Sequence, residues 1–188
     1  AALCAELDVR DPLTGNAVRL VRALAALEAG ERSRGRRELR ALIRQHVDPG
    51  VVLAAVAALA EDLAGSRRFV PAMRLLRSAQ ARLRDRTSRL YLAALELGIE
   101  LQRRGELDAA AVTALLRRLE RRDPPPVHAA VHVLRAEHAL LRGDLAAAVD
   151  AHREARPYAR SGGLASLRRR QELVAQSLRA PFADVEDW

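Results

Sequence analysis

Residues 96–111 read ELGIELQRRGELDAAA, and this stretch holds the pattern that recurs through most of the chain. An apolar helical face is followed by Gly105 and then by the start of a second helix. The position equivalent to Gly105 is Gly143 in the next copy of the pattern and Arg67 in the previous copy. The remaining positions that repeat are small or apolar: Ala60, Gly98 and Ala136; Phe69, Leu107 and Leu145; Ala72, Ala110 and Ala148. A fixed period of this kind, here about 38 residues, predicts a helical repeat.

The composition favours helix almost throughout. Hydrophobic residues make up 49% of the 188 residues, Ala and Leu dominate them, and aromatic residues make up only 3%. Ala and Leu are strong helix formers, whereas strands favour β-branched and aromatic residues. We therefore expect an all-α protein without a sheet.

We expect one domain, residues 1–188, made of helix pairs. Residues 1–50 form a divergent first part, off the register of the repeat, in which residues 31–37 are a polar connector. Residues 51–160 hold three pairs in register, and residues 161–188 hold a capping helix and an acidic tail with aromatic residues. The predicted helices of the later parts are residues 51–64, 67–83, 89–103, 106–121, 127–141, 145–156 and 164–179.

The unit around Gly105 resembles the tetratricopeptide repeat. It has small residues at Gly98 and Ala110, a glycine between two helices, and apolar residues at Leu97, Leu101 and Leu107. The resemblance implies a right-handed superhelical array of α-α hairpins, an α-solenoid, ended by the capping helix. The chain departs from the family in its longer period, about 38 residues against about 34 residues. The positions at which the family has Trp and the terminal Pro hold other residues in this chain, and Arg67 stands where the family has the turn glycine. A generic helical-repeat bundle is the alternative.

In that family the front helices line a groove that holds a peptide or a partner's helix. The resemblance implies ten groove candidates: Leu92, Leu95, Ile99, Gln102, Arg103, Ala130, Val133, Glu137, Leu140 and Leu141. Burial between repeats is the alternative for several of them, because Leu and Val are usually buried. The chain has no Lys, and Asn16 is its one Asn, which argues against the carboxylate clamp of the family's chaperone-tail binders. An apolar segment or amphipathic helix suits the candidates better.

We therefore expect a non-catalytic module that binds a protein or peptide, as the scaffold or sensor part of a larger bacterial regulatory or signalling protein. The alternative is an accessory domain that binds nucleic acid, because the formal net charge is +8 and every basic residue is Arg. The arginines gather in three clusters: Arg32, Arg34, Arg36 and Arg37; Arg117, Arg118, Arg121 and Arg122; Arg168, Arg169 and Arg170. Helix electrostatics account for the second cluster without a ligand.

Neither a catalytic site nor a cofactor or metal site is expected. His128 and His132 have the spacing of two metal ligands on one helical face, but no third ligand follows them, and two polar positions beside an apolar stripe is the favoured interpretation. Phosphate-cradling, nucleophile-elbow and zinc-protease motifs are missing from the sequence. Cys4 has no basic residue at a meaningful spacing, which favours a role as a small apolar residue.

The expected location is the cytoplasm. A single cysteine excludes an internal disulfide, and the sequence has neither a signal-like segment nor a long uncharged apolar run. The chain begins at Ala1 without Met, which favours a domain of a longer protein. Membrane is not an expected partner. For the tail, with Phe182 and Trp188, folding back onto the last helix is favoured over self-association through a neighbouring molecule.

Overall fold

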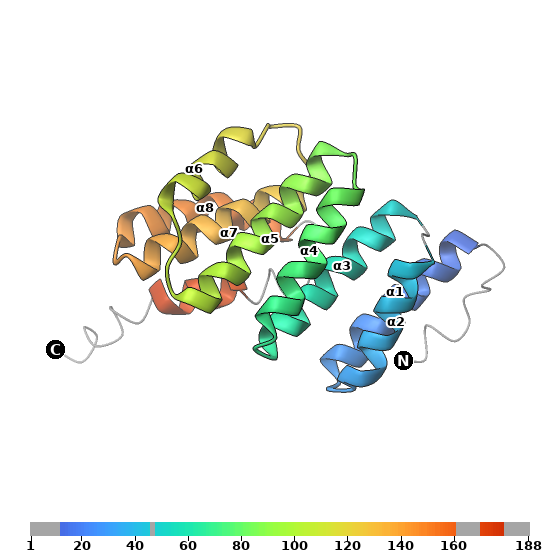
Figure 1. Cartoon of the computed structure of the whole chain (residues 1–188). Helices are drawn as coiled ribbons and strands as arrows, with labels where there is room; N and C mark the ends of the chain where they lie inside the picture. Colours follow the sequence, from blue (N-terminus) through green and yellow to red (C-terminus); the bar gives the residue numbers. More distant parts are fainter. Residues whose placement is uncertain (1–11, 46–47, 161–169, 179–188) are drawn as a thin grey trace. The chain divides into compact units, whose positions relative to one another are not determined.

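The computed structural model describes residues 12–45, 48–160 and 170–178, and this part of the chain is helical without a strand (Figure 1). It confirms the prediction of an all-α protein. The chain divides into two compact units, Ala1–Leu75 and Leu76–Trp188, with the boundary inside one helix. Each unit is described by itself below.

Eight labelled helices follow one another in four pairs. They are α1 (Pro12–Glu28) and α2 (Arg32–Arg44), α3 (Pro49–Gly65) and α4 (Phe69–Arg82), α5 (Arg86–Arg104) and α6 (Ala109–Arg118), and α7 (Pro125–Leu141) and α8 (Leu145–Arg160). Residues 170–178 are also helical, inside the range expected for the capping helix. The front helices of the four pairs begin at nearly equal intervals along the chain. The observed ends lie within a few residues of the predicted ones, except that α6 is several residues shorter.

Aspartates cap the starts of α3 and α5. The Asp48 side chain accepts hydrogen bonds from the Gly50 and Val51 amides at the start of α3, and the Asp85 side chain accepts from the Thr87 and Ser88 amides at the start of α5. Each carboxylate satisfies amide groups that lack a partner within the helix.

The turn within each pair contains one residue with a left-handed backbone. These residues are Gly30, Gly105 and Gly143, with φ of 82°, 72° and 73°, and Arg67, with φ of 57°. After three of the turn residues, the next amide donates to the carbonyl of a residue near the end of the preceding helix: Glu31 to Ala26, Arg68 to Leu63, and Asp144 to Ala139. This is the Schellman motif, which ends a helix by satisfying its last carbonyl groups. Arg67 thus occupies the position that the repeat assigned to a glycine.

The structure corrects our expectation for the first pair. Arg32 begins α2, so most of the predicted connector 31–37 is helical. Gly35 is buried where α2 packs on α1, and a Cβ atom there would lie 2.6 Å from Leu27 Cδ2 and 2.9 Å from the Ala23 carbonyl oxygen. The role of Gly35 is therefore to allow this close approach and not to form a connector. Gly30 and Arg67 are almost as far apart in sequence as the later turn residues are, so the first turn follows the repeat more closely than expected.

Each unit has its own helix packing. In the first unit α1 packs on α2 and α3, and α2 packs on α3. In the second unit α7 packs on α5, α6 and α8, and α5 and α7 lie side by side (Figure 1). Residues 170–178 join this second core through Val174, which packs with Ala136 and Ala151.

Candidate functional site

Half of the predicted groove candidates are core residues. Leu95 is 1% exposed, and four further candidates are buried to a similar degree: Leu92, Ile99, Ala130 and Val133. Such side chains offer no surface to a partner in this structure. The structure therefore corrects the groove prediction at these five positions in favour of its alternative, burial between helices.

Two more candidates make contacts within the second unit. The Glu137 carboxylate pairs with the Arg170 guanidinium, with Oε1 2.8 Å from Nε and Oε2 2.5 Å from an Nη atom. Leu140 is half-buried against the cluster around Val174. Only Gln102, Arg103 and Leu141 remain exposed.

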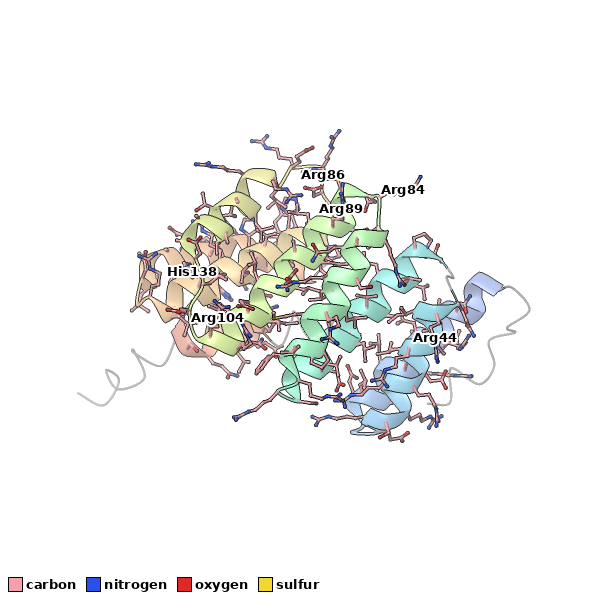
Figure 2. All side chains as sticks on the ribbon, in the orientation of Figure 1. Arg44, Arg84, Arg86, Arg89, Arg104 and His138 are labelled. Atoms are coloured by element: carbon pink, nitrogen blue, oxygen red, sulfur yellow. The ribbon has the colours of Figure 1, made fainter. Side chains whose placement is uncertain are left out.

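The three exposed candidates come from the same end of two neighbouring helices. Gln102 and Arg103 are in the last turn of α5, and Leu141 is the last residue of α7. His138 ties the end of α7 to the segment that follows α5, because its Nε2 lies 3.1 Å from the Leu107 carbonyl oxygen. Figure 2 places Arg104 and His138 at this end of the unit and Arg84, Arg86 and Arg89 at the start of α5.

An apolar surface begins at Leu141 and continues onto α8. Leu141 is 58% exposed, Leu145 is 43% exposed and Val149 is 39% exposed. Leu145 and Val149 are four positions apart, so they share one face of α8. We call these three residues the apolar turn surface. They make up half of the large hydrophobic residues that are exposed in the described part of the chain, and they lie close together in sequence. Clustered exposed apolar side chains mark contact sites for other molecules.

Charged groups occur in the turn between α7 and α8 and at the end of the neighbouring helix α5. Glu100 pairs with Arg103 at 2.7 Å and with Arg104 at 2.5 Å, and Arg142 and Asp144 are exposed in the turn itself. An apolar centre with a charged rim is the usual anatomy of a protein interface. Sequence reasoning missed Leu145 and Val149, because it looked for binding residues only on the front helices.

Arg170 has a role that the sequence did not predict. The sequence places it only in the third arginine cluster, but its guanidinium is largely buried between Glu137 and Gly98. A Cβ atom on Gly98 would lie 2.6 Å from an Arg170 Nη atom. Gly98, expected to let paired helices approach, instead leaves room for this side chain. The ion pair therefore fastens residues 170–178 to α7.

The rings of His128, His132 and Tyr158 form a stack. The His128 and Tyr158 ring centroids are 4.4 Å apart with an interplanar angle of 14°, and His132 Nδ1 lies 3.0 Å from Glu154 Oε2. Burial lowers the pKa of His132, although the Glu154 charge opposes this effect. Within the described residues, no group of three or more His, Cys, Asp and Glu side chains is arranged to hold a metal ion.

The first arginine cluster is partly structural. Arg36 bonds to the Asp62 carboxylate and donates to Ser66 Oγ at 2.6 Å, and Arg32 lies 3.7 Å from the same carboxylate. These contacts join α2 to α3 in the first unit. The expectations for Cys4, Arg168, Arg169, Phe182 and Trp188 fall outside the described residues, so they stay predictions.

A second network joins the two connectors that flank α5 and α6. Arg86 Nη1 donates to Asp123 Oδ1 at 2.8 Å, and Asp123 Oδ1 also lies 3.2 Å from Thr87 Oγ1. The Glu120 amide donates to Asp123 Oδ2 at 2.8 Å. Burial alone would raise the pKa of Asp123, but these hydrogen bonds and the Arg86 charge outweigh it and lower the pKa.

Sequence reasoning missed this network, although a signal for it was present. Asp11, Asp48, Asp85 and Asp123 recur with the period of the repeat, each directly or closely before a front helix. Asp48 and Asp85 are N-caps, whereas Asp123 precedes Pro124, which takes the cap position itself. Asp123 is thereby free to bind Arg86.

Comparison of the chain with protein-family models, with curated proteins and with solved structures finds no match. The helices in the described part of the chain are all too short or too polar to cross a membrane.

Proposed function

We propose that the chain is a non-catalytic helical-repeat module that binds a protein partner through the apolar turn surface, Leu141, Leu145 and Val149. The observation that carries this proposal is the grouping of these exposed apolar side chains on one pair of helices. Their burial against a partner would remove apolar area from water, which is the main favourable term in protein association.

The repeat character of the chain supports the proposal. Four helix pairs each turn through one left-handed residue, and three of these turns share the Schellman hydrogen bonds. Arrays of such pairs present extended binding surfaces to partners. The proposed arrangement is the right-handed superhelix of the tetratricopeptide-like repeats, within a larger regulatory or signalling protein.

The partner segment that fits best is a short amphipathic helix or an apolar peptide. Its apolar side chains would contact Leu145 and Val149, and its polar side chains would face the rim around Glu100 and Arg103. The site differs from the groove expected from the sequence, because it lies at the turn and not along the front helices.

A matched pair of variants tests this proposal. The first is Leu145→Glu with Val149→Glu, and the control is Val21→Glu with Val70→Glu, which places the same change on exposed apolar residues of the other unit. Each immobilised variant is exposed to nuclease-treated lysate, washed at high salt, and its bound proteins are quantified by mass spectrometry against the unchanged chain.

We expect the unchanged chain and the control to retain the same partner and the Leu145/Val149 variant to lose it. All three should melt at similar temperatures, because exposed substitutions usually change stability by less than about 0.5–1 kcal/mol. Retention by both variants would refute the proposed surface, and so would the capture of no protein by the unchanged chain.

A further inference from the structure

The second unit carries a basic surface at the end opposite the apolar turn surface. It is formed by residues 82–89, which lead into α5, and by residues 117–123, which lead from α6 towards α7. We call these two segments together the connector surface. They contain eight arginines against three carboxylates, an excess of five positive charges: Arg82, Arg84, Arg86, Arg89, Arg117, Arg118, Arg121 and Arg122; Asp85, Glu120 and Asp123.

Arg86 holds the two segments together. Its guanidinium bonds to the Asp123 carboxylate, to the Arg118 carbonyl oxygen and, at 3.0 Å, to Glu120. The Asp123 side chain is only 2% exposed, whereas the Arg86 side chain is 37% exposed, so the carboxylate is the part of this joint that is protected from water. Because the joint fixes one segment against the other, arginines from two distant parts of the sequence share one surface. In Figure 2 Arg84, Arg86 and Arg89 are grouped at the start of α5.

The carboxylates of the connector surface are already engaged. Asp85 caps α5, Asp123 binds Arg86, and Glu120 pairs with Arg86 and, at 2.7 Å, with Arg122. Six arginines are exposed and make no salt bridge in the described part of the chain: Arg82, Arg84, Arg89, Arg117, Arg118 and Arg121. Their charge is therefore available to an anionic ligand.

Helix electrostatics do not account for this arrangement. They explain Arg117 and Arg118, which lie at the C-terminal end of their helix, where cations are favoured. Arg89 lies in the first turn of α5, where the helix dipole disfavours a cation, but it is four residues after the N-cap Asp85 and interacts with that carboxylate. Arg121 lies beyond the end of α6, and it makes no salt bridge among the described residues. Local charges therefore account for only part of the excess of arginine on this surface.

We infer that the connector surface binds the phosphate backbone of a nucleic-acid double helix. None of the exposed large hydrophobic residues of the described chain lies on either segment, so this surface lacks the apolar centre of a protein interface. A phosphate backbone needs only spaced cations, and guanidinium groups match phosphate geometry well. Neither segment contains an aromatic residue on which unpaired bases could stack, so phosphate contacts are the interaction that this surface favours.

The test is a salt titration of the full chain with a fluorescent DNA duplex of mixed sequence, followed by anisotropy. A matched RNA duplex forms a second arm, and a fluorescent poly-glutamate peptide forms a third. The variant changes Arg84, Arg89, Arg117 and Arg121 to Gln. The control changes Arg40, Arg44, Arg74 and Arg156, which are also exposed, to Gln, so both variants lose the same net charge.

We expect affinity for both duplexes to fall as salt rises, with a slope of log affinity against log salt of roughly −3 to −4 for about four phosphate contacts. The connector variant should bind at least tenfold more weakly with a slope near zero, whereas the control should bind within about threefold of the unchanged chain. A second variant, Arg84→Gln with Arg121→Gln, should give about half of the slope change and guards against misfolding of the fourfold variant.

Three results would overturn the inference. If the connector variant and the control lost the same affinity for the duplexes, the overall charge of the chain would explain the binding. If neither duplex bound at low salt, nucleic acid would not be the ligand of this surface. If poly-glutamate bound through the connector arginines and the duplexes did not bind, the surface would be assigned to an acidic protein. The proposed protein-binding surface is tested by other residues, so either proposal can fail alone.

Discussion

At the scale of single residues, Arg67 is the exception among the turn residues of the repeat, because the other three are glycines. The equivalent positions Gly30, Gly105 and Gly143 accept a left-handed backbone without steric cost, whereas Arg67 adopts it with a Cβ atom. The hydrogen bonds from Arg67 and Arg68 back to α3 hold the turn in this conformation.

Replacing Arg67 by Gly is therefore expected to stabilise the chain by about 0.5–1 kcal/mol, because the strain of the side chain exceeds the entropy lost by Gly. Gly143→Ala is the matched reverse change and should destabilise it by about 1 kcal/mol. Urea unfolding followed by circular dichroism measures both. If Arg67→Gly lowered stability, the turn at this position would not be strained.

Burial separates two kinds of leucine that the groove prediction treats alike. Leu95→Ala should cost about 2–4 kcal/mol, because the side chain is removed from a packed core. Leu145→Ala should cost less than about 1 kcal/mol, because nearly half of that side chain is already in water. Equal losses of unfolding free energy in the two variants would contradict the placement of these residues.

At the scale of helices and connectors, Asp123 joins the start of α5 to the segment before α7. It binds Arg86, Thr87 and the Glu120 amide with a nearly inaccessible carboxylate. The proposed connector surface depends on this joint, because it holds residues 82–89 and 117–123 together.

Asp123→Ala is expected to destabilise the chain by about 2 kcal/mol, because it leaves several donors without their acceptor. Asp150→Ala is the control, since Asp150 is exposed and its salt bridge to Arg153 is long, at 3.5 Å. The folded pKa of Asp123 is lowered, so its contribution is complete above a pH of about 4 and is lost as the pH falls through the folded value. Urea titrations at pH 7 and pH 3 should show the Asp123→Ala difference shrinking; a constant difference would contradict this role.

His132 should make the α7 and α8 pair sensitive to mild acid. Its folded pKa lies below the unfolded value of about 6.5, so the unfolded chain binds the proton more tightly. The stability that the neutral ring supports is complete above a pH of about 6.5 and is lost as the pH falls through the folded pKa. We expect the melting temperature to fall from pH 7 to pH 5 and to fall less in His132→Gln. Parallel curves for the two proteins would exclude His132 as the source.

The helices could be predicted from the sequence better than their surfaces could. Period and composition located every described helix after residue 50, because small and apolar residues recur wherever helices pack. The period could not tell Leu95 from Leu141, since both are apolar front-helix residues and only the packed structure buries one of them. The prediction of a connector at residues 31–37 was wrong, because Gly35 and the neighbouring arginines are typical of a connector but lie in α2. The connector surface was hidden because Arg84 and Arg121 come together only through Arg86 and Asp123.

At the scale of the second unit, the two proposed surfaces lie at opposite ends of α7, because residues 117–123 precede this helix and Leu141 ends it. The helix has 17 residues and is therefore about 26 Å long. The apolar turn surface and the connector surface share no residue, so a protein and a duplex can be held at the same time. Such a module would bring a regulatory partner to nucleic acid, and the formal net charge of +8 would assist the encounter with the duplex.

Hydrogen exchange can test the proposal that a protein partner binds at the apolar turn surface. The captured partner is purified, and amide exchange of the chain is followed by mass spectrometry with and without it. We predict slower exchange in residues 141–149 in the complex and unchanged exchange in residues 82–89. Protection that is confined to other helices, with residues 141–149 exchanging as in the free chain, would contradict the claim.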